Sequence, residues 1–446
     1  MTQEARDHIS QPAAEAAGPA RDKRRLLLSR RRFVTAGGGA AIGAGALAAG
    51  LRLSQSDAPV VGGTYRDATE PFYGIHQGGV TTTPQSHTYF AALDLATGKR
   101  TDVAELLRAW TDMAANLTAG RPAKPMPTTG DAPAPDSGEA NGLGAARLTI
   151  NFGFGPGLFE KDGTDRYGLR AQRPAALVDL PRFPGDQLIE QKTGGDLTVQ
   201  ACADDPQVAF HAVRQLARAA GGVAAIRWVQ AGFNETPESQ GTPRNLMGFK
   251  DGTINPRTAA QQAAFLWVGA EGPAWMRGGT YLVARRIRIS LEHWDSKSLD
   301  TQQQVIGRYK NSGAPLGQSD EFDPIDLDAT DNGGNPLIPA DSHVRLSSPQ
   351  ANRGQMLLRR GYAYNDGADG FIERWPPWQQ ALMYDAGLLF CAYQRDPRTG
   401  FIPIFGNLAE NDALNQFTTQ TGSVVAALPP TAPAPGSFVG QLLLKR

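Results

Sequence analysis

The side chains that could bind a metal ion are few in this sequence. It has six histidines and two cysteines, Cys202 and Cys391, among 446 residues. No two histidines lie three or four residues apart, the spacing that places two ligands on one face of a helix. Two cysteines exclude a disulfide framework, a zinc site of the CxxC type and a cysteine-ligated iron–sulfur cluster. Any metal must therefore be held by other ligands.

A metal site with a single histidine ligand is compatible with this sequence, because haem iron needs only one proximal histidine. His343 is the best candidate, since it lies in Asp341–Leu346 (DSHVRL), between a long loop and a predicted strand. His211 falls on the apolar side of a predicted helix, where a packed core histidine is more common than a ligand. His76 and His87 flank a turn-rich segment, and we expect structural roles for them.

A second group of residues with catalytic potential is Gly248–Thr253 (GFKDGT). Glycines on both sides of Asp251 allow a tight or positive-φ backbone, which can hold a short carboxylate rigidly at the tip of a loop. The spacing alone does not separate a catalytic carboxylate from an ordinary turn, so both interpretations stay open at this point.

The rest of the sequence describes the scaffold that must position these residues. Hydrophobic residues make up 41% and charged residues 20% of the chain, which is typical of a globular protein with a large core. The 44 Lys and Arg balance the 44 Asp and Glu, so the charge gives no indication of nucleic acid or an anionic membrane as a partner. The 51 glycines and 32 prolines indicate many turns.

Hydrophobic periodicity predicts helices and strands in a mixed order. We expect helices over residues 102–115, 205–219, 300–308 and 411–418, the second one capped by Asp204 or Asp205. We expect strands over residues 147–154, 197–201, 224–229, 279–289, 357–364 and 387–394. Because the elements lack the regular spacing of a doubly wound sheet, the pattern favours two α+β domains, divided into residues 59–235 and 236–446. Residues 120–142 are predicted to be a solvated, dispensable surface insertion.

The first 58 residues have the features of an export signal. Ser29–Val34 (SRRRFV) matches the twin-arginine pattern, and Ala36–Leu51 is an uncharged stretch shorter than the about 20 residues that a membrane span needs. The alternative is a basic tail before a Gly/Ala linker. We expect a signal peptide over residues 1–58, transport by the twin-arginine translocase, and a mature protein in the periplasm, at the cell wall or in the medium. Because this route moves folded proteins, it favours a cofactor that is loaded before export.

Several separated motifs, in a defined order, give this sequence its resemblance to a known family. They are YGIHQ (73–77), QACADDP (200–206), GFKDG (248–252), HVRL (343–346) and RRGY (359–362). Together with the leader, they make the chain similar to the dye-decolourising peroxidases, in particular to the exported branch that includes deferrochelatase/peroxidase proteins. The resemblance runs from about Val60 to about Leu428, apart from the 120–142 insertion.

This resemblance implies an α+β fold of two ferredoxin-like domains with antiparallel sheets, and a haem b (iron protoporphyrin IX) in the C-terminal half. It implies an enzyme that reduces hydrogen peroxide through an oxoferryl intermediate and oxidises dye-like, phenolic or metal-complex donors, with the physiological reductant undefined. The alternative is a deferrochelatase-like protein that handles haem in iron acquisition. The sequence leaves open whether the chain forms a homo-oligomer and whether Cys202 pairs with Cys391.

The resemblance also assigns the cofactor-binding residues. His343 is the expected metal ligand, and its second ring nitrogen should donate to a carboxylate or carbonyl, for which Glu410 and Asp412 are candidates. Other haem-lining residues are assigned by position only, and the Ser347-Ser348 pair departs from the Ala-Asn that relatives often have. The assigned residues are Gly252, Thr253, Ile254, Ser348, Pro349, Gln350 and Arg359.

On the opposite side of the haem, the resemblance makes Asp251 the group that moves a proton between the two oxygens of peroxide. Arg359 is expected to stabilise developing negative charge and to keep Asp251 ionised. Because neighbouring side chains of a strand point to opposite faces, Arg360 is then expected at the surface or at a haem propionate. A carboxylate base, with a reference pKa of about 3.9, predicts an acidic pH optimum.

Bulky dyes cannot enter a pocket sized for peroxide, so their electrons would travel through aromatic side chains at the surface. Aromatic residues cluster near the predicted site in the sequence, and core packing explains most of them equally well. They are Tyr362, Tyr364, Trp375, Trp378 and Tyr384.

Overall fold

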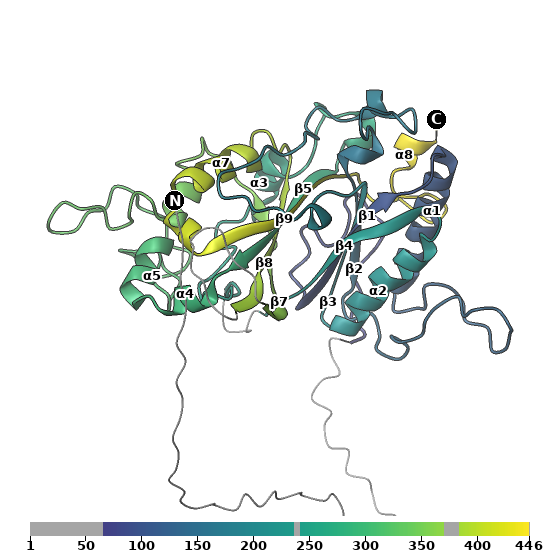
Figure 1. Cartoon of the computed structure of the whole chain (residues 1–446), viewed down its shortest axis with the longest axis horizontal. Helices are drawn as coiled ribbons and strands as arrows, with labels where there is room; N and C mark the ends of the chain where they lie inside the picture. Colours follow the sequence, from purple (N-terminus) through teal and green to yellow (C-terminus); the bar gives the residue numbers. More distant parts are fainter. Residues whose placement is uncertain (1–65, 236–240, 370–382, 446) are drawn as a thin grey trace, which may run out of the picture. The chain divides into compact units, whose positions relative to one another are not determined.

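The structure is a computed structural model that describes residues 66–235, 241–369 and 383–445, so the predicted leader lies outside the described residues. Its N-terminal half contains four strands and two α-helices (Figure 1). They are β1 (His87–Leu95), α1 (Arg100–Leu117), β2 (Thr149–Phe154), β3 (Leu197–Ala203), α2 (Pro206–Ala219) and β4 (Ala224–Phe233). The carboxylate of Asp205 caps α2 by accepting from the backbone N–H groups of Gln207 and Val208, as one of the two predicted caps should.

The C-terminal half repeats the mixture with more and shorter helices. Its strands are β5 (Thr280–Ile289), β6 (Leu358–Arg359), β7 (Tyr362–Asp369), β8 (Met383–Gln394) and β9 (Thr418–Leu428). Its helices are α3 (Ala259–Phe265), α4 (Leu291–Asp295), α5 (Leu299–Ile306), α6 (His343–Ser347), α7 (Phe401–Asn411) and α8 (Gln441–Leu444). Short 3₁₀ turns lie at Pro156–Leu158, Arg170–Gln172, Glu190–Lys192, Ala274–Met276 and Ala413–Gln416.

The same strand order occurs in both halves. The N-terminal strands pair in the order β2-β3-β1-β4, and the C-terminal ones in the order β9-β5-β8-β7, all antiparallel. Strand, helix, two strands, helix and strand in this order make a ferredoxin-like unit. The two sheets meet at the pairs Phe154–Ala427 and Phe233–Ala363, so the strands form a closed ring with few free edges. The predicted α+β fold class is confirmed.

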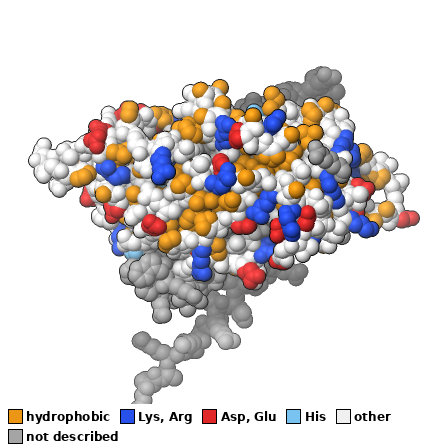
Figure 2. Space-filling view, turned by 90° about the horizontal axis from the view of Figure 1, so that it is seen from above, with side chains coloured by type: hydrophobic (Ala, Val, Ile, Leu, Met, Phe, Trp, Pro, Cys, Tyr) orange, Lys and Arg blue, Asp and Glu red, His pale blue; other side chains and the backbone are white. Residues whose placement is uncertain are grey.

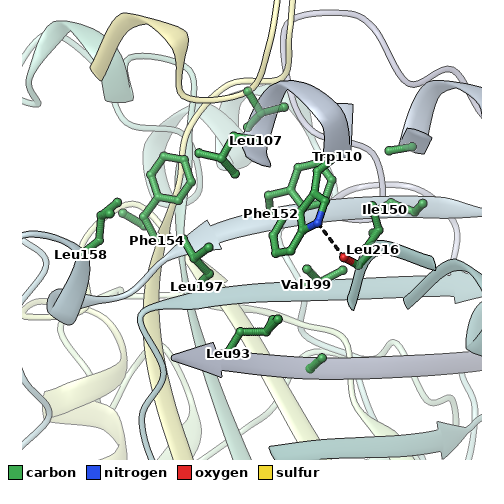
Figure 3. Packing of buried hydrophobic residues seen from close by; sticks show 14 of the residues in the cluster. Leu93, Leu107, Trp110, Ile150, Phe152, Phe154, Leu158, Leu197, Val199 and Leu216 are labelled. Atoms are coloured by element: carbon green, nitrogen blue, oxygen red, sulfur yellow. Dashed lines mark hydrogen bonds between the residues drawn. The ribbon is translucent and has the colours of Figure 1, made fainter. Parts of the chain in front are cut away.

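Three apolar clusters hold the described part of the chain together. The first joins the N-terminal sheet and its helices to residues of β5, β8, β9 and α7, and in it the rings of Trp110 and Phe152 stack at 5.4 Å and Trp110 Nε1 donates to the Leu216 carbonyl at 2.8 Å (Figure 3). The second is formed by residues of both sheets and contains Cys391. The third lies in the C-terminal half and contains Phe249 and Val344. Cys202 and Cys391 are both buried free thiols, which answers the question of their pairing.

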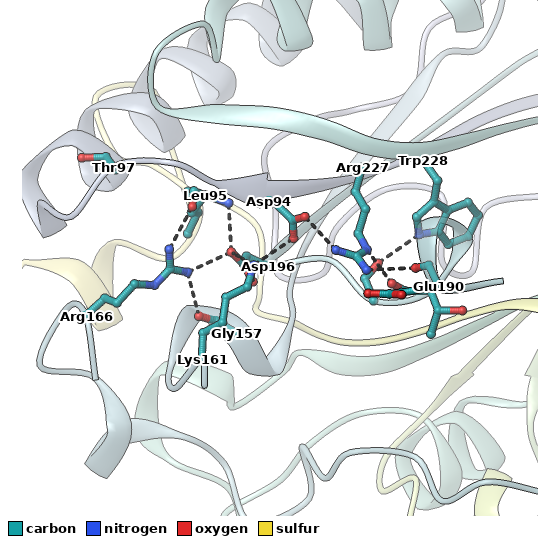
Figure 4. Close-up of polar contacts among 12 residues, drawn as sticks. Asp94, Leu95, Thr97, Gly157, Lys161, Arg166, Glu190, Asp196, Arg227 and Trp228 are labelled. Atoms are coloured by element: carbon teal, nitrogen blue, oxygen red, sulfur yellow. Dashed lines mark hydrogen bonds and ion pairs between the residues drawn. The ribbon is translucent and has the colours of Figure 1, made fainter. Parts of the chain in front are cut away.

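A buried carboxylate fixes one end of the N-terminal sheet (Figure 4). Asp196, which is 2% exposed, accepts from the Leu95 N–H at 2.9 Å and pairs with Arg166 at 2.8 Å and with Lys161 at 3.1 Å. Because the carboxylate is almost fully removed from water, losing these partners would leave a buried charge without compensation. This network stabilises the fold and lies apart from the site described below.

One predicted element is wrong. The predicted helix at 411–418 does not form: α7 ends at Asn411, and Asp412 has extended backbone (ψ 124°) and caps a 3₁₀ turn. The predicted strand at 357–364 is confirmed: β6 and β7 pair with β8 in the same register, and the Arg360 N–H, which lies between them, bonds to the Cys391 carbonyl at 2.8 Å.

The insertion at 120–142 is only partly solvated. Most of its residues are exposed, but Asp136 is fully buried and accepts from the N–H of Ala123, which is also buried, at 2.7 Å, so the prediction of a solvated segment is wrong at these two positions. Elsewhere, the face in Figure 2 has basic and acidic side chains interspersed, as the balanced charge leads us to expect. Among the described residues, the helices are too short or too polar for a membrane span.

Candidate active site

A cavity in the C-terminal half brings Asp251 together with His343 and Arg359, which lie 92 and 108 residues further along the chain. Its walls are mostly apolar, which suits a flat hydrophobic ligand with polar groups at a few positions. Side chains from β5, β8 and α7 form these walls, and its empty volume is about 1450 Å³. The apolar lining residues include Ile287, Ile289, Leu388, Phe390, Phe405 and Leu408.

His343 is the first residue of α6, at the end of the long loop, and its side chain is 28% exposed to the cavity. Its Nδ1 lies 2.6 Å from Oδ2 of Asp412, whose side chain is 3% exposed. Because a carboxylate can only accept, Nδ1 carries the proton and Nε2 keeps a free lone pair. The other oxygen of Asp412 accepts from the Leu414 N–H at 2.8 Å, which fixes the carboxylate. Of the two predicted partners, the geometry therefore selects Asp412 over Glu410.

Asp251 and Arg359 form the second polar pair of the cavity. Arg359 Nη1 lies 3.3 Å from Asp251 Oδ1, and each side chain is 23% exposed. Gly248 (φ +84°) and Gly252 (φ +93°) have the left-handed backbone expected on the two sides of this carboxylate. The Asp251 N–H also donates to the Pro243 carbonyl at 3.0 Å, so the loop tip is fixed at its backbone.

Asn255, which the sequence did not single out, holds Arg359 in place. Its side-chain amide donates to the Arg359 carbonyl at 2.8 Å and its oxygen accepts from the Arg359 N–H at 3.0 Å. This two-way bond fixes the short strand β6 to the loop that follows Asp251. Only the tertiary structure pairs residues 255 and 359, so no local pattern could have found it.

Arg360 corrects one expectation. As predicted, it points away from Arg359, but it is 3% exposed and donates to the Thr82 carbonyl and to Gln85. It does not line the cavity of His343, so the expected surface or propionate position is wrong. The physical reason is that both faces of this strand are covered, one by the cavity and the other by the N-terminal half.

Arg308 is a cavity residue that the sequence analysis missed. It is 3% exposed and donates to the carbonyls of Gly313 at 2.7 Å and Glu321 at 3.0 Å. Within the described part of the chain, no carboxylate lies at ion-pair distance from it. Burial, and then the charge of Arg359, lower the pKa of Arg308 to about 10, although Glu321 opposes this shift. A buried guanidinium without an anion is costly, so an acidic group in the cavity would stabilise it.

This donor set fits a haem. His343 offers one imidazole nitrogen, Asp251 and Arg359 add a second polar pair to the same cavity, and the apolar walls suit a porphyrin. Arg308 supplies the cation that a propionate needs. No cluster of three or more His, Cys, Asp or Glu that could hold a bare metal ion occurs among the described residues.

Comparison with known proteins decides the family. Two family descriptions match the chain: "Dyp-type peroxidase, N-terminal" over residues 77–234 and "Dyp-type peroxidase, C-terminal" over residues 242–432. The chain belongs to the Dyp-type peroxidase family. The enzyme class, and the haem b cofactor that goes with membership, are those that the resemblance implied.

Similar members of the family cover most of the chain. The dye-decolorizing peroxidase of Thermobifida fusca (strain YX) is 38% identical over 392 residues, 83% of this chain and 84% of the relative. The deferrochelatase of Escherichia coli (strain K12) is 33% identical over 428 residues, 94% and 97% of the two chains. The structure of ferric DtpA from Streptomyces lividans is 40% identical, with a TM-score of 0.76 over 86% of this chain and 98% of DtpA.

Some residues assigned through the family motifs line the cavity and others do not. Thr253, Ile254 and Pro349 line it together with His343, Asp251 and Arg359. Gly252, Ser348 and Gln350 are not in its lining. Ser348 is fully buried and its hydroxyl donates to the Arg345 carbonyl, so it shapes the turn after α6, while Ser347 takes the lining position.

The aromatic residues considered for electron transfer in this Dyp-type peroxidase have different environments. Tyr362 and Tyr364 are fully buried, which agrees with core packing, and Tyr384 is 53% exposed. Trp375 and Trp378 lie outside the described residues.

Proposed function

We propose that this chain is a peroxidase that binds haem b through His343, reduces hydrogen peroxide with Asp251 and Arg359, and oxidises dye-like, phenolic or metal-complex donors. The observation that carries the proposal is the presence of two polar pairs, His343–Asp412 and Asp251–Arg359, in one largely apolar cavity of a Dyp-type chain. Haem b, when bound, supplies the iron at which peroxide is reduced.

The proton chemistry belongs to Asp251. An ionised carboxylate accepts a proton from one oxygen of peroxide and returns it to the other, which then leaves as water. Asp251 lines the cavity, and 23% of its side chain is exposed there. A molecule as small as peroxide can therefore reach the carboxylate. Its backbone, fixed between two positive-φ glycines, keeps the carboxylate in position during both transfers.

Arg359 supplies the positive charge for this step. Its guanidinium has only donors, so it stabilises negative charge on oxygen and leaves the proton transfer to Asp251. Asn255 positions it through the backbone of β6. The pair thus separates two roles, proton transfer by the carboxylate and charge stabilisation by the guanidinium.

His343 is prepared for metal ligation by Asp412. The hydrogen bond from Nδ1 to the buried carboxylate fixes the tautomer and the ring orientation, and makes Nε2 a stronger base. Arg308 would hold a propionate at the edge of the cavity, where its guanidinium has only carbonyl partners.

The proposal includes export by the twin-arginine translocase, supported by the SRRRFV motif and the uncharged stretch that follows it. The mature protein would then act in the periplasm, at the cell wall or in the medium, with residues 59–235 and 236–446 as its two domains.

An electronic spectrum of the purified protein, before and after one equivalent of hydrogen peroxide, tests this function. A Soret band that shifts within the mixing time and returns on addition of a phenol is the expected result. Absence of the band, or a band that peroxide leaves unchanged, would refute the proposal.

A second candidate function is removal of iron from haem with the porphyrin left intact. It is favoured by the relatives named deferrochelatase, which match 94% of this chain. Incubating the haem-loaded protein under reducing conditions and measuring iron-free protoporphyrin by fluorescence separates the two candidates. Porphyrin that accumulates in stoichiometric amounts supports the second function, and intact haem with rapid peroxide turnover supports the first.

A further inference from the structure

The cavity of His343 shares a wall with a second cavity that opens at the surface, here called the outer cavity. Five residues line both cavities: Thr253, Ile254, Arg308, Pro349 and Met356. The outer cavity is open to solvent, and the space within it, about 1000 Å³, can hold a small aromatic molecule. Whatever binds there lies directly beside the edge of the haem cavity.

One wall of the outer cavity is aromatic and carries an unneutralised cation. Phe322 is 47% exposed, and the guanidinium carbon of Arg257 lies 4.4 Å from the centre of its ring. Arg257 is itself exposed, and no carboxylate of the described chain is within ion-pair distance of it. Pro324, Ile325 and Met356 extend the apolar surface. A flat ring with one anionic substituent matches this combination of surface and charge.

The acidic residues of the outer cavity already have partners. Glu321 pairs with Lys250 at 2.9 Å. Asp323 accepts from the backbone N–H groups of Ser319 at 3.1 Å and Asp320 at 2.8 Å. Arg308, at the inner end, would be neutralised by the haem propionate. These backbone bonds hold the Asp323 carboxylate in its own turn but leave its negative charge. The cation that lies against the exposed aromatic ring is Arg257.

Resting on the proposed function, we propose that the outer cavity is the binding site of the electron donor, and that the donor is a monocyclic phenol with a carboxylate group. The carboxylate pairs with Arg257, the ring packs on Phe322 and Met356, and the hydroxyl end points towards Arg308. Each phenol gives up one electron and its hydroxyl proton and becomes a phenoxyl radical. Two phenols therefore reduce one hydrogen peroxide to two water molecules.

The experiment compares two probes of equal shape, 4-hydroxybenzoate and 4-hydroxybenzamide, which differ in charge. Ferric iron shortens the NMR relaxation times of ligand protons that bind near it, so proton relaxation reports binding at the haem edge without turnover. We expect Arg257→Glu to weaken the relaxation enhancement of the 4-hydroxybenzoate protons about tenfold. The relaxation enhancement of the 4-hydroxybenzamide protons should change less than about twofold. Arg257→Lys, which retains the charge, should preserve most of the effect.

The matched control is Arg182→Glu, which introduces the same charge change at an exposed arginine of a different surface cavity. Unchanged 4-hydroxybenzoate relaxation in this control, with a loss in Arg257→Glu, supports the inference. Equal relaxation of 4-hydroxybenzoate in Arg257→Glu and the unsubstituted holoenzyme overturns it, as does no relaxation effect in the unsubstituted holoenzyme. Failure of the proposed function is recognised separately, because the Soret band of the unsubstituted holoenzyme would then be absent or would not respond to hydrogen peroxide.

Discussion

Two histidines of this protein lie beside carboxylates, and only one of them is arranged to bind a metal. His343 has Nδ1 bonded to Asp412, and its Nε2 has no partner among the described residues. His211, in α2, has Nε2 3.4 Å from Asp136 and Nδ1 3.1 Å from Glu139. A ligand needs one ring nitrogen fixed and the other free, so His343 is suited to iron and His211 to holding the insertion.

The surroundings of the two histidines also differ: those of His211 are filled by protein, and those of His343 include a cavity. His211 is 4% exposed, and both sides of its ring are occupied by the segment that includes Asp136 and Glu139. His343 faces a cavity whose other polar pair is Asp251–Arg359. Burial alone therefore does not identify a ligand. What identifies it is an unoccupied nitrogen that faces a space with matching chemistry.

Substituting each histidine in turn tests this comparison, and we expect the largest effect of all on the Soret band. His343→Ala should abolish the Soret band, because it removes the nitrogen that ligates iron, and added imidazole should restore part of the band. His211→Gln is the matched control: we expect the full band and a lower melting temperature, since Asp136 would lose a buried partner. Absorption spectra and thermal melts measure both. A full band in His343→Ala would refute the ligand assignment.

Asp251→Asn tests the second polar pair of the cavity, Asp251–Arg359. The amide keeps the shape but cannot carry a proton between peroxide oxygens, so the bimolecular reaction with peroxide should slow by about 10² to 10⁴. The Soret band should be unchanged. Stopped-flow absorption measures the rate, and Asp131→Asn, at an exposed aspartate of the 120–142 insertion, provides the control. If the rate stayed within a factor of about two, Asp251 could not be the proton carrier.

Asp412→Asn tests the hydrogen bond between Asp412 and His343, which is the feature that separates His343 from His211. An asparagine can still face Nδ1, but it removes the negative charge that makes Nε2 more basic. The affinity of the protein for haem should therefore fall by about 10- to 100-fold. Haem transfer to apomyoglobin measures the affinity, and Glu410→Gln, the neighbouring acid that does not contact His343, should match the unsubstituted protein. Equal losses in both variants would contradict a specific role for Asp412.

These residues also show how far the sequence alone can lead. His343, Asp251 and Arg359 were found because each lies in a short motif, and the family's fold followed from the order of those motifs. Asp412 and Glu410 could not be separated, because a helix predicted over 411–418 gives no reason to turn one acid inward. The structure ends α7 at Asn411, and this end points Asp412 at His343.

Arg308 and Arg360 were missed or misplaced for a different reason. Arginine is usually exposed, so a sequence gives no local indication that a particular one is buried. Arg308 is buried because the carbonyls of Gly313 and Glu321 surround it, and Arg360 because the N-terminal half covers its side of the strand. Both facts depend on contacts between distant segments, which periodicity does not encode.

The smallest predicted effect concerns Glu139, one of the partners of His211. Burial raises its pKa, but hydrogen bonds from Ser137, its own backbone, His211 and Arg214 outweigh this and lower the pKa from 4.5 to about 2. A carboxyl group whose pKa is lowered by folding stabilises the protein above its unfolded pKa and loses that contribution as the pH falls towards the folded value. Glu139→Gln should therefore lower the melting temperature by about 2 °C at pH 6, and by progressively less below pH 4.5. Asp131→Asn, an exposed residue of the same segment, should leave the melting temperature unchanged throughout. A difference between Glu139→Gln and the unsubstituted protein that stayed constant from pH 6 to pH 3 would show that the side chain acts by packing, and that charge does not distinguish this histidine site from His343.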